Sequence, residues 1–146
     1  MVPVVEKPIP HRQLDVAPMA ETLRLESEVH FAFDRADLST QGKMLLDDII
    51  AKSMAKGSRI EVVGIGGHAD RIGEPFYNHD LAMRRALAVG KYLVSKDVSA
   101  SKLDMREFGQ SQPRVACEGV KGKALIECLA PNRRAEVVVI VKRDQK

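Results

Sequence analysis

The chain has 146 residues, of which 23 are basic and 20 are acidic, and its formal net charge is +3. This length supports one compact domain with a short tail, and the small, interspersed charge gives no basic tract that would indicate a nucleic-acid partner. No apolar run approaches the roughly 18 residues that cross a bilayer, and the first residues lack the basic start and apolar block of a signal peptide. The chain is therefore expected to be either cytosolic or part of a longer precursor.

The sequence predicts a linker or tail over residues 1–22 and a single domain over residues 23–146. The start of the chain shows no apolar periodicity and carries four prolines: Pro3, Pro8, Pro10 and Pro18. Because proline fixes its own backbone angle and lacks an N–H donor, such a segment favours an extended chain over a helix or a central strand.

The domain is predicted to open with a strand over residues 29–33 and a helix over residues 40–56. The strand carries apolar side chains on one face: Val29, Phe31 and Phe33. Ser39 or Thr40 is expected to cap the helix, and Gly57 to end it. The apolar side of the helix consists of Leu45, Leu46, Ile49, Ile50 and Ser53.

A second strand is predicted over residues 59–65, after which a glycine-containing loop leads into a helix that begins at Asn78 or His79 and ends near Lys96. A short strand over residues 103–108 follows.

The last part of the chain is predicted to be a long loop over residues 109–131, with a helical turn near residues 123–128, and a final strand over residues 135–142. The valine-rich run of this strand is typical of burial on both faces. The order strand, helix, strand, helix, strand, strand predicts an α/β (α+β) sandwich whose helices pack on a mixed sheet.

Arg85 is the most informative residue of the predicted second helix. At 100° per residue it falls in the middle of the apolar face, whereas its neighbour Arg84 points away. That face consists of Leu81, Ala88, Val89 and Tyr92. Leaving a buried charge without its partner costs about 3–5 kcal/mol, so an inward arginine must be paired or must open to a cleft.

Asp70 is the nearest candidate partner, in the loop that leaves the second predicted strand. Such strand ends are where open α/β sheets place ligands. Asp70 and Arg85 at one cleft suit a zwitterion, with the carboxylate taking an ammonium and the guanidinium taking a carboxylate. The alternative is a structural ion pair between the two. Asn78 lies where it would cap the helix or offer its amide to a ligand.

Cys117 and Cys128 lie in the same predicted loop, with no further cysteine or nearby histidine. This is poor zinc spacing. A local disulfide, which would imply an oxidising compartment, is favoured over two free thiols.

The segment from Gly67 to Ala86 resembles the signature of the OmpA-like peptidoglycan-binding family, GHTDxxGxxxYNxxLSxxRA. The resemblance extends over residues 27–142 and includes Phe33-Asp34, residues 108–113 and residues 132–137. The threonine of the signature is Ala69 here, which removes a hydroxyl contact, and its serine is Ala82, which weakens capping of the helix start.

The resemblance implies a non-enzymatic periplasmic domain with the order βαβαββ. It implies non-covalent binding of the diaminopimelate residue of the peptidoglycan stem peptide, which anchors the outer membrane to the cell wall through a part outside this chain. Asp70 and Arg85 would clamp that residue. The other ligand-binding residues implied are Asn78, Leu81, Arg133 and, through their backbones, Asp34 and Ala69. No cofactor or metal is implied.

The segment over residues 124–131 is similar to the branch of the family that contains enterobacterial OmpA and neisserial RmpM. Because that branch carries a disulfide in this loop, the resemblance implies a bond between Cys117 and Cys128. Closing so short a loop would contribute roughly 2–3 kcal/mol in the chain-entropy model.

Several other functions have weaker support. A metal hydrolase would use a cluster of His68, Asp70, His79 and Asp80. A nucleotide-binding loop after residue 64 lacks the full glycine spacing, and no nucleophile arrangement or carboxylate pair indicates an enzyme. The main alternative to wall binding is an interaction module of an envelope complex, or a homodimer. Met83 and Leu87 would form the contact in that case.

Overall fold

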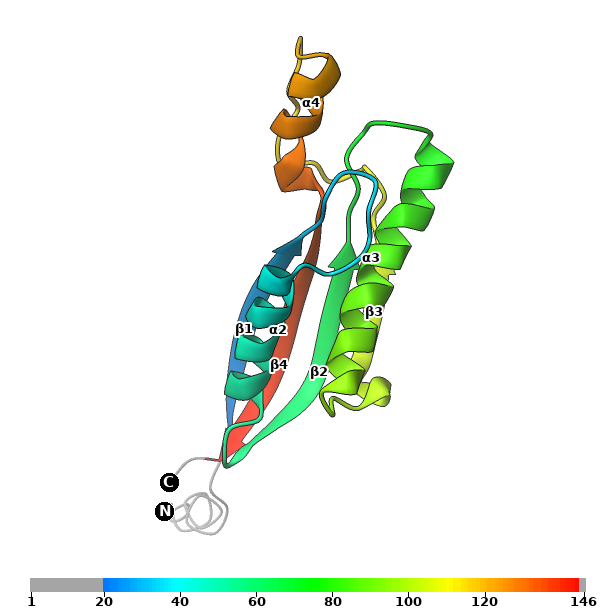
Figure 1. Cartoon of the computed structure of the whole chain (residues 1–146). Helices are drawn as coiled ribbons and strands as arrows, with labels where there is room; N and C mark the ends of the chain where they lie inside the picture. Colours follow the sequence, from blue (N-terminus) through cyan, green and yellow to red (C-terminus); the bar gives the residue numbers. More distant parts are fainter. Residues whose placement is uncertain (1–19, 145–146) are drawn as a thin grey trace, which may run out of the picture.

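The computed structural model describes residues 20–144 (Figure 1). In chain order its main elements are β1 (Ala20–His30), α2 (Thr40–Ser53), β2 (Ser58–Gly67), α3 (Pro75–Ser95), β3 (Leu103–Glu107), α4 (Gly122–Cys128) and β4 (Arg134–Asp144). Most of the predicted linker, residues 1–19, lies outside the described residues. The first strand already begins at Ala20, before the predicted domain start, and ends at His30 rather than at Phe33.

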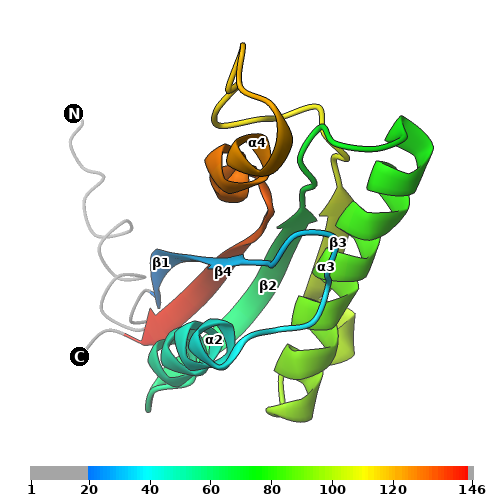
Figure 2. The ribbon, with the colours of Figure 1, turned by 45° about the horizontal axis from the view of Figure 1, so that its top comes forward.

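The strands form one mixed sheet in the order β1-β4-β2-β3. β4 runs antiparallel to both of its neighbours, whereas β2 and β3 are parallel and are connected through α3. Figure 2 shows α2 and α3 on the same side of this sheet. The predicted α/β sandwich with helices on a mixed sheet is confirmed.

An aliphatic core fills the space between the helices and the sheet. It includes Val29, Leu46, Ile49, Val63, Ile65, Ala86, Val89, Leu93, Val137, Val139 and Val141. On the other face of β4, Glu136, Val138 and Ile140 are only half-buried. The predicted burial of this strand on both faces is therefore wrong, because α2 and α3 cover one face only.

The predicted cap of α2 is confirmed, because the Ser39 side chain accepts a hydrogen bond from the Gly42 N–H at 2.9 Å. The helix ends at Ser53, with Met54 as its cap, so Gly57 lies in the following turn, where its φ of 81° suits glycine. Leu45 is 40% exposed and thus outside the packed side of the helix.

α3 begins at Pro75, with Glu74 as its N-cap. Proline is favoured in the first turn, since its missing N–H would have no partner there. Asn78 therefore lies inside the helix and does not cap it. At Gly67 a Cβ atom would be only 1.9 Å from the Ala82 carbonyl oxygen, so glycine lets α3 approach the end of β2 closely. This contact brings the predicted site residues of the helix and the loop together.

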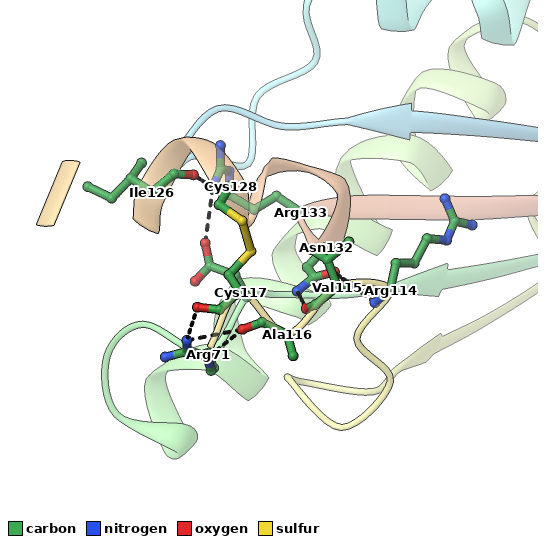
Figure 3. The surroundings of a disulfide bond; sticks show 10 residues. Arg71, Arg114, Val115, Ala116, Cys117, Ile126, Cys128, Asn132 and Arg133 are labelled. Atoms are coloured by element: carbon green, nitrogen blue, oxygen red, sulfur yellow. Dashed lines mark hydrogen bonds and ion pairs between the residues drawn. A yellow bond between two sulfur atoms is a disulfide. The ribbon is translucent and has the colours of Figure 1, made fainter. Parts of the chain in front are cut away.

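The long loop before β4 contains α4 and is closed by a disulfide between Cys117 and Cys128 (Figure 3), which confirms the predicted bond. None of the helices within residues 20–144 has the length and apolar character needed to cross a membrane.

Candidate functional site

A pocket of about 180 Å³ lies where three segments of the chain meet. The connection between β1 and α2 contributes Phe33 and Asp34, the loop after β2 contributes Asp70, and α3 contributes most of the remaining wall. The full lining is Phe33, Asp34, Asp70, Ile72, Gly73, Tyr77, Asn78, Leu81 and Arg85. We call this space the Arg85 pocket. It brings together five of the seven predicted ligand-binding residues, whose roles in binding stay predictions.

Arg85 lies at the inner end of this pocket, with 0% of its surface exposed. Its guanidinium donates hydrogen bonds to three backbone carbonyls, those of Arg35 at 2.9 Å, His68 at 2.9 Å and Ala32 at 3.3 Å. It also lies over the Phe31 ring, 5.3 Å from the centroid. A guanidinium has five N–H donors, so one donor on each terminal nitrogen has no hydrogen bond to residues 20–144.

Burial lowers the pKa of Arg85 to about 10, while the charge of Asp70 raises it and that of Arg133 lowers it. The group therefore stays protonated at neutral pH. Its inward orientation agrees with the expectation from helical periodicity. The partners of Arg85 differ from those expected, because none of the ion pairs within residues 20–144 joins Arg85 to Asp70. The alternative of a direct structural pair between these two is wrong.

Asp70 is paired with Arg133 instead. One of its carboxylate oxygens accepts from Arg133 Nη1 at 3.1 Å, and the other accepts from the Ile72 N–H at 3.0 Å. The side chains of Asp70 and Arg133 are only 6% and 8% exposed. Because both groups are buried together and hydrogen-bonded, the carboxylate is held in one orientation at the pocket wall.

Arg133 stands behind Asp70 and does not line the pocket. It also donates to the Phe31 carbonyl at 3.2 Å and to the Ile126 carbonyl at 2.8 Å. Arg133 therefore links the disulfide loop, at Ile126, to the Asp70 carboxylate. Figure 3 shows Arg133 beside Ile126 and the disulfide. Arg133 thus supports Asp70 from outside the pocket lining, and its predicted contact with the ligand stays a prediction.

Two other predicted residues lie on the pocket wall with defined partners. The Asn78 amide donates to the Gln110 side-chain oxygen at 2.8 Å, and the Asp34 carboxylate accepts from the Tyr77 hydroxyl. Asp34 has a φ of 58°, a left-handed conformation that aspartate tolerates better than most residues. Leu81 completes the apolar part of the wall and is 4% exposed.

Ala69 is not part of this pocket. Its N–H donates to the Gly109 carbonyl at 2.9 Å, and its predicted backbone contact with the ligand stays a prediction. The wall residues that the sequence did not predict are Phe33, Ile72, Gly73 and Tyr77. Phe33 and Tyr77 directly precede the predicted residues Asp34 and Asn78, and Ile72 and Gly73 follow Asp70 in the same loop. Tyr77 and Gly73 are positions of the family signature, which was the available signal for them.

The proposed metal cluster is not assembled. His79 bonds to Glu107 at 2.9 Å, and Asp80 bonds to Arg84 at 2.9 Å. Within residues 20–144 no group of three or more histidine, cysteine or acidic side chains is arranged to hold a metal ion.

Known proteins are similar to this chain in sequence and in fold. Outer membrane protein A of Yersinia pseudotuberculosis is 43% identical over 84% of this chain and 36% of that protein. Outer membrane protein P5 of Haemophilus influenzae is 39% identical over 83% of this chain and 35% of that protein. The chain thus spans little more than a third of these two relatives.

Among solved structures, the peptidoglycan-associated lipoprotein from Burkholderia pseudomallei has a TM-score of 0.61 and 27% identity, covering 77% of this chain and 88% of that one. The OmpA-like domain of FopA1 from Francisella tularensis has a TM-score of 0.63 and 20% identity, covering 90% and 88%, a likeness that shows the fold. The sequence profile of the OmpA family matches residues 30–126 of this chain. The chain therefore belongs to the OmpA family.

Proposed function

We propose that this domain binds peptidoglycan without a covalent bond, by holding the diaminopimelate residue of the stem peptide in the Arg85 pocket. The observation that carries the proposal is a buried, protonated guanidinium that contacts carbonyls but no carboxylate within residues 20–144, at the inner end of a pocket that an acidic side chain also lines. Arg85 therefore offers a positive charge to an anionic group of the ligand, and the acidic wall offers a negative charge to a cationic group.

The side-chain end of diaminopimelate is a zwitterion, with an ammonium and a carboxylate on one carbon. Its carboxylate matches the remaining donors of Arg85, since guanidinium and carboxylate geometry allows two parallel hydrogen bonds. Its ammonium matches Asp70, with Asp34 as a second acidic group at the pocket. Lysine at the same stem position has no such carboxylate, so the pocket would discriminate against lysine-type peptidoglycan by leaving Arg85 unpaired.

Binding of this kind would anchor the outer membrane to the cell wall. Two observations support the location: the relatives at about 40% identity are outer membrane proteins, and the Cys117–Cys128 bond is typical of an oxidising compartment such as the periplasm. The connection to the membrane would lie in a part outside the described residues.

Co-sedimentation with purified sacculi tests the proposal. We expect the domain to sediment with diaminopimelate-type sacculi and not with lysine-type sacculi. Asp70→Asn, which keeps the shape of the side chain but removes its charge, should abolish sedimentation. Arg84→Ala is the matched control, because Arg84 lies beside Arg85 in α3 but is exposed and paired with Asp80.

The proposal is wrong if a folded Asp70→Asn variant sediments as well as the unmodified domain, or if both kinds of sacculi bind equally. Thermal unfolding of each variant shows that loss of binding does not reflect loss of the fold.

A further inference from the structure

A second cavity, of about 320 Å³, lies on the other side of the Asp70 loop, between that loop and the disulfide loop. Its lining consists of Ala69, Arg71, Gln110, Pro113, Val115, Ala116, Glu118 and Asn132. We call it the Arg71 cavity. The residues on either side of Asp70 line it, whereas Asp70 itself lines the Arg85 pocket, so three consecutive residues serve two neighbouring spaces.

The two spaces also share a hydrogen bond. Asn78, on the wall of the Arg85 pocket, donates to the side-chain oxygen of Gln110, on the wall of the Arg71 cavity. This contact fixes the orientation of the Gln110 amide, because its oxygen accepts the hydrogen bond. The N–H groups of the same amide are then free to donate elsewhere. On another side of the pocket, the Tyr77–Asp34 hydrogen bond joins α3 to the connection after β1.

Arg71 is exposed, unlike Arg85, but its guanidinium also donates to backbone carbonyls. Its Nε and Nη2 donate to the Ala116 carbonyl at 3.3 and 3.1 Å, and Nη2 also reaches the Cys117 carbonyl at 3.3 Å (Figure 3). No ion pair within residues 20–144 includes Arg71, and its Nη1 has no hydrogen bond to the part of the chain described. The guanidinium is held in place by carbonyls while its charge stays without an anion.

The wall beside Arg71 is tied together by hydrogen bonds and by the disulfide. The Asn132 side chain, 1% exposed, accepts from the backbone N–H groups of Arg114 and Val115 and donates to the Val115 carbonyl. The Cys117–Cys128 bond closes the same loop. A site whose walls are fixed before binding loses less conformational entropy when a ligand enters.

We propose that the Arg71 cavity is a second subsite for the stem peptide, which takes the carboxylate of a residue adjacent to diaminopimelate. The inference rests on the proposed function of the Arg85 pocket. A pocket of about 180 Å³ has room for about one amino-acid residue, so the neighbouring stem residues lie outside it. Arg71 and the free amide of Gln110 bind the carboxylate, and Glu118 provides an acceptor for a peptide N–H.

Two stem residues carry such a carboxylate: the d-glutamate before diaminopimelate and the d-alanine after it. Calorimetric titration of a synthetic stem tetrapeptide distinguishes them. One analogue has d-isoglutamine in place of d-glutamate, and a second has a C-terminal carboxamide. Because a charge-assisted contact at an exposed site is worth about tenfold in affinity, we expect one of the two amides to bind about tenfold more weakly than the parent peptide.

Two substitutions test whether this difference in affinity between the acid and amide peptides arises at the Arg71 cavity. Gln110→Glu keeps the acceptor for Asn78 but replaces the free amide with a negative charge, and Arg71→Gln removes the guanidinium charge. In both variants the difference between acid and amide should fall below about twofold. Free meso-diaminopimelate, which occupies the Arg85 pocket alone, should bind both variants and the unmodified domain within about twofold of each other.

The second subsite is excluded if both amides bind the unmodified domain as tightly as the parent peptide. It is also excluded if the variants lose free diaminopimelate as strongly as they lose the tetrapeptide, because Arg71 and Gln110 would then only support the first pocket. If free diaminopimelate does not bind the unmodified domain at all, the proposed function itself is wrong, and the second subsite with it.

Discussion

Two sites near the end of β2 each contain a buried arginine, Arg134 in one and Arg85 in the other, and they differ in what neutralises its charge. In the first, Arg134 donates to the Glu136 carboxylate at 2.9 Å, and Arg114 bridges Glu136 and Glu28. His68, 1% exposed, bonds to Glu136 at 3.1 Å. We call these five residues the Glu136 cluster. In it each arginine contacts a carboxylate of the chain.

In the Arg85 pocket the same residue type is buried at least as deeply but contacts carbonyls. Arg134 is 4% exposed and Arg85 is 0% exposed, so burial does not separate the two. What separates them is the partner and the open space beside it. A buried arginine that is paired with a carboxylate of the chain stabilises a fold, whereas one held by carbonyls alone next to a pocket retains its charge for a ligand.

The largest effect on stability and binding should come from replacing Arg85 and Arg134, one at a time. Arg85→Ala takes the donor from three carbonyls, and because each unsatisfied group costs about 1–3 kcal/mol, we expect a loss of at least about 3 kcal/mol of unfolding free energy. Binding of diaminopimelate should also disappear. Urea unfolding and calorimetric titration measure the two quantities.

Arg134→Ala is the comparison. It should cost about 2 kcal/mol, since one carboxylate and the Gln112 carbonyl lose a donor, but it should leave the affinity for diaminopimelate within about twofold. An equal loss of ligand affinity in both variants would remove the distinction between the two groups.

A smaller effect is expected from two adjacent glycines of β2. At Gly67 a new Cβ atom would overlap the backbone of Ala82 in α3, whereas at Gly66 it would meet the Phe108 ring at 3.0 Å. A ring can shift and a helix backbone cannot do so easily, so we expect Gly67→Ala to cost about 3 kcal/mol and Gly66→Ala about 1 kcal/mol. Only Gly67→Ala should also weaken ligand binding, because it displaces α3. Similar effects of the two changes on binding would contradict this account.

The smallest effect concerns pH and the Glu136 cluster. The hydrogen bond from Arg114 lowers the pKa of Glu28 from its ordinary value of 4.5, against the opposing effect of burial. A carboxyl group with a lowered folded-state pKa stabilises the fold above the unfolded pKa, and this contribution disappears as the pH falls through the folded pKa. Because this ion pair is partly exposed, with the Arg114 side chain 41% and the Glu28 side chain 26% accessible, the contribution at pH 7 is at most about 1 kcal/mol.

Glu28→Gln should therefore destabilise the domain slightly at pH 7, and the difference from the unmodified domain should vanish as the pH falls well below 4.5. Urea unfolding at a series of pH values measures this difference. A difference that stays constant with pH would show that the Arg114 contact does not depend on the charge of Glu28.

The sequence predicted the parts of the site that depend on local geometry. Helical periodicity placed Arg85 inward, and the position of Asp70 at a strand end placed it at the same pocket. The hydrogen-bond partners of Arg85 were not predictable in this way. The carbonyls of Ala32 and Arg35 lie 53 and 50 residues away from it in the chain, so they meet the guanidinium only after the sheet and α3 have packed together.

The same limit explains the errors in the fold. The first strand was predicted to begin at residue 29 but begins at Ala20. Its early part carries charged side chains such as Arg24, which an edge strand with one exposed face tolerates. The run of valines in β4 indicated burial on both faces, yet whether a second layer covers a sheet depends on where the helices pack. The engagement of the Ala69 amide by Gly109 is likewise a contact between distant segments.

The most direct test of the central claim is calorimetric titration of meso-diaminopimelate into the domain and into two matched variants, Asp70→Asn and Glu136→Gln. Each variant keeps the side-chain shape and removes one negative charge. We expect Asp70→Asn to weaken binding by at least about tenfold and Glu136→Gln to change it by less than about twofold. Equal affinities for the unmodified domain and a folded Asp70→Asn variant would contradict the account.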